Sequence, residues 1–129
     1  MNKKEIKHPD DQGGGNAAPF SEGILVDGWL FVSGQGPLDI KTGKVVHGTI
    51  EEETGLVLRH IEKILCAGGA SMEDVVKCTC HLANIEDFDR FNVVYKKFFK
   101  GVLPARITVQ SVLWGGIKVE LDAIARIKK

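Results

Sequence analysis

One arginine stands where a connection is predicted to become a strand. Arg106 lies two positions after Pro104 and precedes the strand-favouring run ITV. Because proline restricts the residue before it and gives a sharp entry to the strand, the sheet can hold this guanidinium rigidly. The planar guanidinium fork suits a carboxylate or a phosphate oxyanion. A surface ion pair is the commoner role for such a residue, so spacing alone leaves both roles open.

A carboxylate sits on the last predicted strand, within the run KVELDAI that begins at Lys118. Strict alternation puts Lys118, Glu120 and Asp122 on one face of this strand and apolar residues on the other. A solvated face is the simplest interpretation. If another subunit covers the face, Glu120 becomes a partly buried carboxylate that can act as an acid or base on a water or an amine.

Three further residues carry weaker signals. Ser33 and Gly34 follow a predicted strand, where a hydroxyl and a backbone amide can face an oxyanion, although an ordinary turn is the commoner explanation. The Gly-x-Ser-x-Gly sequence of a hydrolase nucleophile does not occur. Asn92, on the second predicted helix, can either cap a neighbouring backbone group or meet a ligand.

Cysteine and histidine do not show the spacing of a metal site. Cys78 and Cys80 are two positions apart and point to the same face of a strand, which predicts buried, reduced thiols. Cys66 makes the count odd, which favours reduced thiols inside a cell. No phosphate-binding loop or dinucleotide fingerprint is present. The histidines are scattered along the chain (His8, His47, His60 and His81).

The elements that must position these residues follow from local patterns. A short edge strand is predicted at residues 4–8 and a glycine-rich loop at residues 10–18. The dipeptide DG at positions 27–28 favours the positive φ angles of a tight turn, so it predicts a hairpin of strands at 24–26 and 29–32.

A helix is predicted to begin at Thr49, because this side chain can cap the free amides and Glu52 completes a capping box. Glycines at 68–69 end it. The remaining predicted elements are a strand at 75–82, a helix at 86–99, and strands at 106–113 and 117–127 separated by a turn at 114–116. Alternation in the first of these strands puts one set of side chains together on a buried face (Val76, Cys78, Cys80 and Leu82).

The chain of 129 residues is predicted to form a single domain over residues 1–129. The order of elements predicts an α+β fold, with both helices on one face of a mixed sheet. The other face also needs cover, and nothing left in the chain can supply it. This points to neighbouring subunits.

Charge and hydropathy exclude some classes of partner. Lysine plus arginine and aspartate plus glutamate balance at 17 each, which argues against nucleic acid. No apolar run is long enough to span a bilayer, and the first residues have no hydrophobic signal core. We therefore expect a cytoplasmic protein with no membrane partner.

Taken in order, several of these segments resemble the signatures of the Rid (YjgF-like) family. The resemblance covers nearly the whole chain from residue 19, and its carboxy-terminal signature is the most specific part. The matching segments are PFSEG at 19–23, FVSGQGP at 31–37, TGKVV at 42–46, DFDRFNVVYKKFF at 87–99, PAR at 104–106 and IKVELDAIA at 117–125.

The resemblance implies a chorismate-mutase-like α+β fold and a homotrimer with clefts between its subunits. It also implies a deaminase that removes reactive metabolites. Such enzymes hydrolyse the 2-imino or enamine acids released by pyridoxal-phosphate enzymes to 2-keto acids and ammonia, without a metal or organic cofactor.

Individual residues match the family's site. Arg106 is similar to the arginine that binds the substrate carboxylate, and Glu120 to the acid that places or activates water. Other positions match the lining of the cleft (Ser33, Gly34, Asn92 and Thr108). Phe20 stands where well-studied deaminating members have tyrosine, so the aromatic wall remains without its hydroxyl.

Two alternatives remain open. One is a pathway-specific member of the superfamily, such as an aminomuconate-type deaminase with a larger substrate. The other is a trimeric protein that binds small carboxylates without catalysis, which the loss of a hydroxyl at Phe20 favours. Arg106 and Glu120 together favour an enzyme.

Overall fold

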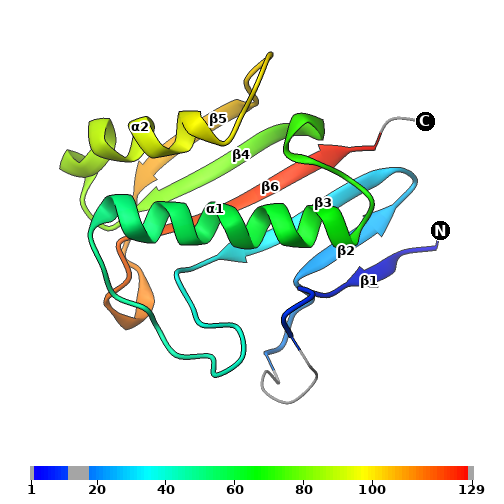
Figure 1. Ribbon diagram of the computed structural model, residues 1–129, viewed down its shortest axis with the longest axis horizontal. Helices are drawn as coiled ribbons and strands as arrows, with labels where there is room; N and C mark the ends of the chain where they lie inside the picture. Colours follow the sequence, from blue (N-terminus) through cyan, green and yellow to red (C-terminus); the bar gives the residue numbers. More distant parts are fainter. Residues whose placement is uncertain (1, 12–17, 128–129) are drawn as a thin grey trace.

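The computed structural model describes residues 2–11 and 18–127. In this part of the chain six strands form one sheet in the order β1-β2-β3-β6-β4-β5 (Figure 1). Neighbouring strands are antiparallel except β4 and β5, which are parallel. The strands are β1 (Lys4–Ile6), β2 (Gly23–Val26), β3 (Trp29–Gln35), β4 (Val75–Leu82), β5 (Ala105–Gln110) and β6 (Val119–Arg126). The helices are α1 (Ile50–Ala67) and α2 (Phe88–Lys97), with short 3₁₀ turns at Met72–Asp74, Ile85–Asp87 and Trp114–Gly116.

The hairpin between β2 and β3 forms at its predicted position. Asp27 and Gly28 adopt φ angles of 52° and 80°, as a two-residue turn between twisted strands requires. β1 pairs with β2 and confirms an edge strand at this place, although it ends at Ile6 and not at His8 as predicted. Of the loop predicted at residues 10–18, positions 12–17 lie outside the described residues.

Helix α1 begins and ends at the predicted signals. The Glu52 amide donates to the Thr49 hydroxyl (3.1 Å), and the Thr49 amide donates to the Glu52 carboxylate (2.9 Å). Gly68 caps the other end, and Gly69 follows at a φ angle of 87°. The caps satisfy free backbone groups, and burial of one apolar side holds the helix on the sheet. The fully buried residues of this side are Ile50, Val57, Leu58, Ile61, Ile64 and Leu65.

Strand β4 departs from strict alternation at its start. Val75 is buried whereas Val76 is 44% exposed, so the prediction that Val76 shares the buried face was wrong. The pairing with β6 shifts between Val75 and Lys77, and this bulge turns Val76 outward. Cys78 and Cys80 are buried thiols, as predicted, and burial raises the pKa of Cys80 to about 12.

The last two strands are shorter than predicted. β5 ends at Gln110 because this residue pairs with Leu82, the final residue of the strand beside it. β6 begins at Val119 because the Lys118 amide donates to the buried Glu53 carboxylate (2.7 Å) rather than to a strand. A side chain on α1 therefore sets where the last strand starts.

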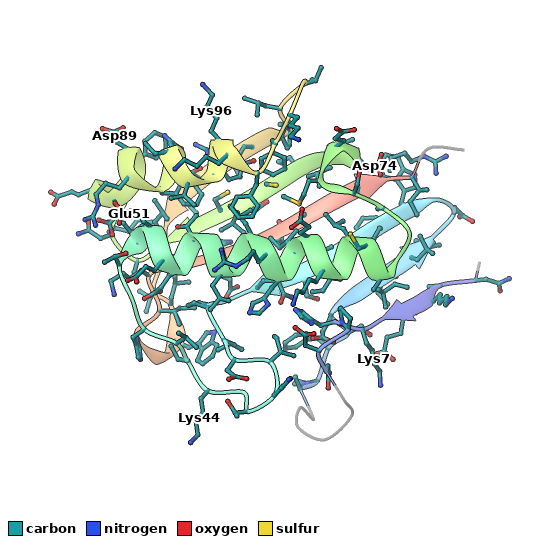
Figure 2. All side chains as sticks on the ribbon, in the orientation of Figure 1. Lys7, Lys44, Glu51, Asp74, Asp89 and Lys96 are labelled. Carbon is teal, nitrogen blue, oxygen red and sulfur yellow. The ribbon has the colours of Figure 1, made fainter. Side chains whose placement is uncertain are left out.

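Helix α2 is also shorter than predicted. It begins at Phe88, after a 3₁₀ turn, and ends at Lys97, where the Phe98 amide bonds to the carbonyl three residues back (3.1 Å). The Arg90 guanidinium donates to the Glu51 carboxylate at 2.7 and 2.8 Å and joins α2 to the first turn of α1. Figure 2 labels Glu51 at this end of α1. Both side chains are exposed, so this pair adds little stability.

Both helices pack on one face of the sheet, as predicted, and the core lies between these two layers (Figure 1). No helix in the described part of the chain covers the opposite face. Within residues 2–11 and 18–127, no helix combines the length and apolar character needed to cross a membrane. Apolar side chains on the uncovered face are between 36% and 51% exposed (Trp29, Phe31, Ile107 and Val109).

Candidate active site

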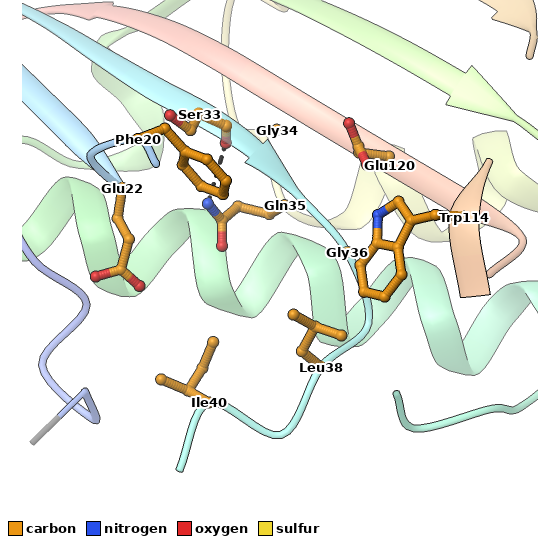
Figure 3. A pocket seen from close by; sticks show the side chains of 10 residues that line it. All are labelled: Phe20, Glu22, Ser33, Gly34, Gln35, Gly36, Leu38, Ile40, Trp114 and Glu120. Carbon is orange, nitrogen blue, oxygen red and sulfur yellow. Dashed lines mark hydrogen bonds between the residues drawn. The ribbon is translucent and has the colours of Figure 1, made fainter. Parts of the chain in front are cut away.

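A pocket of about 430 Å³ opens beside the carboxyl end of β3. Four predicted site residues line it: Phe20, Ser33, Gly34 and Glu120. Figure 3 shows them with lining residues that carried no chemical signal in the sequence: Glu22, Gln35, Gly36, Leu38, Ile40 and Trp114. Segments from the amino-terminal part, from β3 and from β6 therefore meet at one cavity.

The Glu120 carboxylate lies against the backbone of Gly34. The pairing of β3 with β6 is irregular between Val32 and Gln35, and this bulge contains Ser33 and Gly34. A Cβ atom on Gly34 would lie 2.6 Å from Glu120 Oε2, well inside van der Waals contact. Only glycine at position 34 leaves the half-buried Glu120 side chain in this place.

Two hydrogen bonds from Ser33 hold the segment that carries Phe20. Its hydroxyl donates to the Ser21 carbonyl, and its amide donates to the Glu22 carbonyl (2.9 Å). The hydroxyl proton is thus used within the chain, whereas the oxygen lone pairs remain for a donor. Phe20 is 57% exposed and offers the pocket an apolar ring (Figure 3).

A buried histidine pair lies behind the pocket. His8 Nε2 and His60 Nδ1 are 2.9 Å apart, and His60 Nε2 is 2.7 Å from the carbonyl oxygen of Leu38, which lines the pocket. The His8 amide donates to the carboxylate of Glu22, another lining residue (2.9 Å). Burial lowers the pKa of both rings, that of His8 to about 4, so both are neutral at pH 7. Sequence reasoning missed this pair because 52 positions separate its members.

A second group of predicted residues gathers between α2 and β5. The Arg106 guanidinium carbon lies 4.7 Å from the ring centre of Tyr95, 5.4 Å from that of Phe91 and 5.5 Å from that of Phe88. Aromatic faces attract a cation and restrict its movement. Within residues 2–11 and 18–127, no carboxylate forms an ion pair with Arg106. Its charge is therefore held in place and left available to an anion.

Asn92 and Thr108 flank this cation. A cavity of about 270 Å³ is lined by Asn92, Leu103, Pro104 and Arg106, among others. Asn92 Oδ1 is buried and has no hydrogen-bond partner in the described part of the chain, so it can accept a bond from a ligand. Thr108 lies two positions along β5 on the same face as Arg106, and its hydroxyl is buried.

These two groups lie on opposite faces of the sheet. Arg106 pairs with the buried Cys78 and faces α2, whereas Glu120 alternates with the buried Leu121 and faces away from the helices. One chain therefore carries two separate half-sites and does not bring them together. We call them the carboxylate half-site (Phe20, Ser33, Gly34 and Glu120) and the arginine half-site (Asn92, Arg106 and Thr108).

The half-sites offer complementary chemistry. The arginine half-site holds a fixed cation that suits an organic acid. The carboxylate half-site holds an acid/base group next to a cavity. Among the described residues, no group of three or more His, Cys, Asp or Glu side chains is arranged to hold a metal ion.

Known proteins resemble this chain along most of its length. Residues 14–127 match the family described as endoribonuclease L-PSP. A RutC family protein of Pyrococcus abyssi is 43% identical over 108 residues, which cover 83% of this chain and 85% of that protein. The human protein named 2-iminobutanoate/2-iminopropanoate deaminase is 38% identical over 112 residues, which cover 86% of this chain and 82% of its own.

Solved structures share the fold. A Rid family protein of Yersinia pestis is 34% identical with a TM-score of 0.88, and the match covers 98% of this chain and 100% of that one. Escherichia coli TdcF, solved with bound serine, is 30% identical with a TM-score of 0.85, covering 97% of this chain and 99% of its own. The predicted α+β fold is confirmed by the sheet, by its helical layer and by these neighbours. Because both the family match and the relatives span most of the sequence, the chain belongs to the Rid (YjgF-like) family.

Proposed function

We propose that this protein hydrolyses 2-imino and enamine acids, as released by pyridoxal-phosphate enzymes, to 2-keto acids and ammonia. The observation that carries the proposal is the Arg106 guanidinium, held over three aromatic rings without an ion-pair partner in the described part of the chain. The name of the human relative supports this class of reaction. TdcF, whose structure holds serine, supports a ligand that carries a carboxylate.

In the proposed reaction Arg106 clamps the substrate carboxylate. Two charge-assisted hydrogen bonds would contribute roughly 1.5–3 kcal/mol each to binding. The clamp also fixes the imine carbon relative to a water molecule, which removes part of the entropic cost of their encounter. Asn92 Oδ1, which is buried in the cavity that Arg106 lines, would accept a hydrogen bond from the substrate nitrogen.

Glu120 would then move the protons. Water adds to the electrophilic carbon of the protonated imine while the Glu120 carboxylate takes one of its protons. Glu120 then returns that proton to the nitrogen of the carbinolamine, and ammonia leaves as the hydroxyl oxygen forms the carbonyl of the keto acid. The hydroxyl proton passes to the Glu120 carboxylate and from there to the departing ammonia. The protonated imine and one water give the keto acid and one ammonium ion, without oxidation or reduction.

A complete site requires two copies of the chain, because the half-sites face opposite sides of the sheet. We propose a homotrimer in which the arginine half-site of one subunit meets the carboxylate half-site of the next. The exposed apolar side chains on the uncovered sheet face supply a surface for such an assembly. We place the enzyme in the cytoplasm, where its three unpaired cysteines would stay reduced.

The decisive experiment follows imine survival. An amino-acid oxidase or a pyridoxal-phosphate dehydratase generates imino acids, and semicarbazide traps whatever imine remains. Wild-type protein should lower the semicarbazone signal, whereas Arg106→Ala should not, with both proteins equally folded by circular dichroism. Arg106→Lys, which keeps the charge and loses the planar fork, should retain only part of the activity. Unchanged turnover in Arg106→Ala would rule out this residue as the clamp.

Mixing two inactive variants tests the shared site. Arg106→Ala and Glu120→Gln disable different half-sites, so a mixed trimer regains one intact site. Three quarters of randomly assembled trimers are mixed and each regains one site of three, so about a quarter of wild-type activity should return. If the mixture stays inactive although each variant assembles normally, the two half-sites do not combine across subunits.

Two other functions are separated by the same assays. Saturable binding of a keto acid without turnover of any imine would indicate a carboxylate-binding protein, which the missing hydroxyl at Phe20 favours. Turnover restricted to a larger dienamine would indicate a pathway-specific, aminomuconate-type deaminase. The matched family is described as endoribonuclease L-PSP. The chain has 17 basic and 17 acidic residues, and this balanced charge does not favour binding to the phosphate backbone of RNA.

A further inference from the structure

The cavity beside β3 has an apolar wall that the proposed chemistry does not use. Phe20 and Trp114 stand on two sides of it, and Leu38 and Ile40 lie along its lower edge (Figure 3). Phe20 and Trp114 are 57% and 54% exposed, so their rings present open apolar surface. Glu120 lies beside Gly34 and next to the Trp114 ring (Figure 3). A substrate held near Glu120 would direct its side chain toward these four residues.

The position of Trp114 depends on its neighbours. A Cβ atom on Gly36 would lie 3.9 Å from Trp114 Cζ2 and 3.3 Å from Ile117 Cδ1, so the ring packs close to the Gly36 backbone. Ile117 is fully buried, and its amide donates to the Trp114 carbonyl (3.3 Å). Gly115 follows Trp114 with a φ angle of 63°, which favours glycine. The turn that carries the indole is thus anchored in the core at one end.

The other parts of the wall are anchored as well. The bonds from Ser33 to Ser21 and Glu22 hold the segment next to Phe20. The buried His60 ring holds the Leu38 carbonyl at 2.7 Å. The apolar wall is therefore assembled by contacts from three separate parts of the chain, and a ligand would find it largely formed.

We propose that this wall is a side-chain subsite and that Trp114 selects 2-imino acids with bulky apolar or aromatic side chains. The volume of about 430 Å³ far exceeds what a methyl or ethyl group fills, since pockets of roughly 300–1,000 Å³ hold whole drug-sized ligands. Each methylene buried there would raise kcat/KM about fourfold, from its transfer free energy. The carboxylates of Glu22 and Glu120 in the same cavity would repel an acidic side chain.

The proposal rests on the deaminase function proposed above. Its test compares imino acids made by an amino-acid oxidase from alanine, leucine and phenylalanine, with wild type, Trp114→Ala and Val112→Ala. Val112 lies in the same connection, is fully exposed and does not line the cavity, so it is the matched control. Wild type should prefer the phenylalanine-derived imine to the alanine-derived imine by at least about tenfold in kcat/KM.

Trp114→Ala should remove most of that preference and change the rate on the alanine-derived imine less than about twofold, whereas Val112→Ala should keep the preference. A wild-type preference for the alanine-derived imine would overturn the proposal. An equal loss on all three imines in Trp114→Ala would do so too, because it would indicate a structural role.

Product binding separates this proposal from the proposed function. Phenylpyruvate and pyruvate are titrated by calorimetry, which needs no turnover. Tighter binding of phenylpyruvate by wild type, lost in Trp114→Ala, supports the subsite even if no imine is hydrolysed. Equal affinities for the two keto acids would refute the subsite even if imines are hydrolysed.

Discussion

Lowering the pH should destabilise this fold through its buried histidine pair. The Asp10 amide donates to His8 Nδ1 (3.0 Å), so the proton of the neutral His8 ring is on Nε2 and is donated to His60 Nδ1. The His60 proton is then on Nε2 and is donated to the Leu38 carbonyl. An added proton on His8 would face the Asp10 amide, and one on His60 would face the His8 N–H. Either proton would replace a hydrogen bond by a contact between two donors.

The size of the effect follows from the His8 pKa. Burial, and then the neighbouring His60, lowers this pKa from 6.5 to about 4. Above pH 6.5 the ring is neutral in both states, and the fold has its full stability. As the pH falls toward 4, His8 becomes protonated in the unfolded chain but stays neutral in the folded chain, so the free energy of unfolding decreases. At about 1.4 kcal/mol per pKa unit, the loss reaches about 3 kcal/mol. Burial lowers the pKa of His60 as well, which acts in the same direction.

Urea unfolding at fixed protein concentration, from pH 7.5 to 4.5, measures this loss. Wild type should lose roughly 2–3 kcal/mol over this range, and His8→Gln, which cannot titrate, should lose much less. His47→Gln removes an exposed histidine and should follow wild type. Carboxylates such as Glu51, whose pKa Arg90 lowers to about 2, contribute only at lower pH. Wild-type stability that does not change over this range, or equal slopes for wild type and His8→Gln, would refute the reasoning.

Three other substitutions test the site and its support. Gly34→Ala should displace the Glu120 carboxylate, because a Cβ at position 34 would lie 2.6 Å from its oxygen. We expect kcat/KM in the imine assay to fall about 100-fold with unchanged circular dichroism. Full activity would show that Glu120 does not need a fixed position. Glu53→Ala should cost about 3–5 kcal/mol in urea unfolding, because two backbone amides and a lysine lose a buried acceptor, whereas Glu53→Gln, which keeps one acceptor, should lose less. Tyr95→Leu should raise KM roughly tenfold by removing a ring from under Arg106, whereas Tyr95→Phe should not; equal effects of both would assign the role to the hydroxyl.

Local signals in the sequence predicted those parts of the fold that local chemistry decides. The Thr49–Glu52 capping box and the turn at 27–28 each depend on a few adjacent residues. Strand and helix ends depended on distant partners instead. β5 ends at Gln110, which pairs with the last residue of β4. β6 begins after Lys118, whose backbone amide donates a hydrogen bond to the Glu53 carboxylate on α1. Val76 was assigned to the wrong face because a bulge depends on the register with a neighbouring strand.

The candidate site was also predictable only where local patterns decide it. Alternation correctly put Glu120 on the face away from the core. It could not relate that face to Arg106, because the two residues lie on strands separated by β4. Glu22 and Leu38 line the cavity through tertiary contacts alone, so no local pattern singled them out. The assignment of roles to Arg106, Glu120 and the lining residues stays a prediction until the variants are measured.

The short strand β1 limits how far the chain can be truncated at its amino-terminal end. Although it has only three residues, it covers one edge of β2, and His8 just beyond it bonds into the interior. A fragment that starts at β2 would expose the unpaired edge of a strand that can join other molecules edge to edge. It would also leave His60 without the donor to its Nδ1 atom. We therefore expect a fragment that lacks residues 4–8 to be less stable than the full chain and to aggregate.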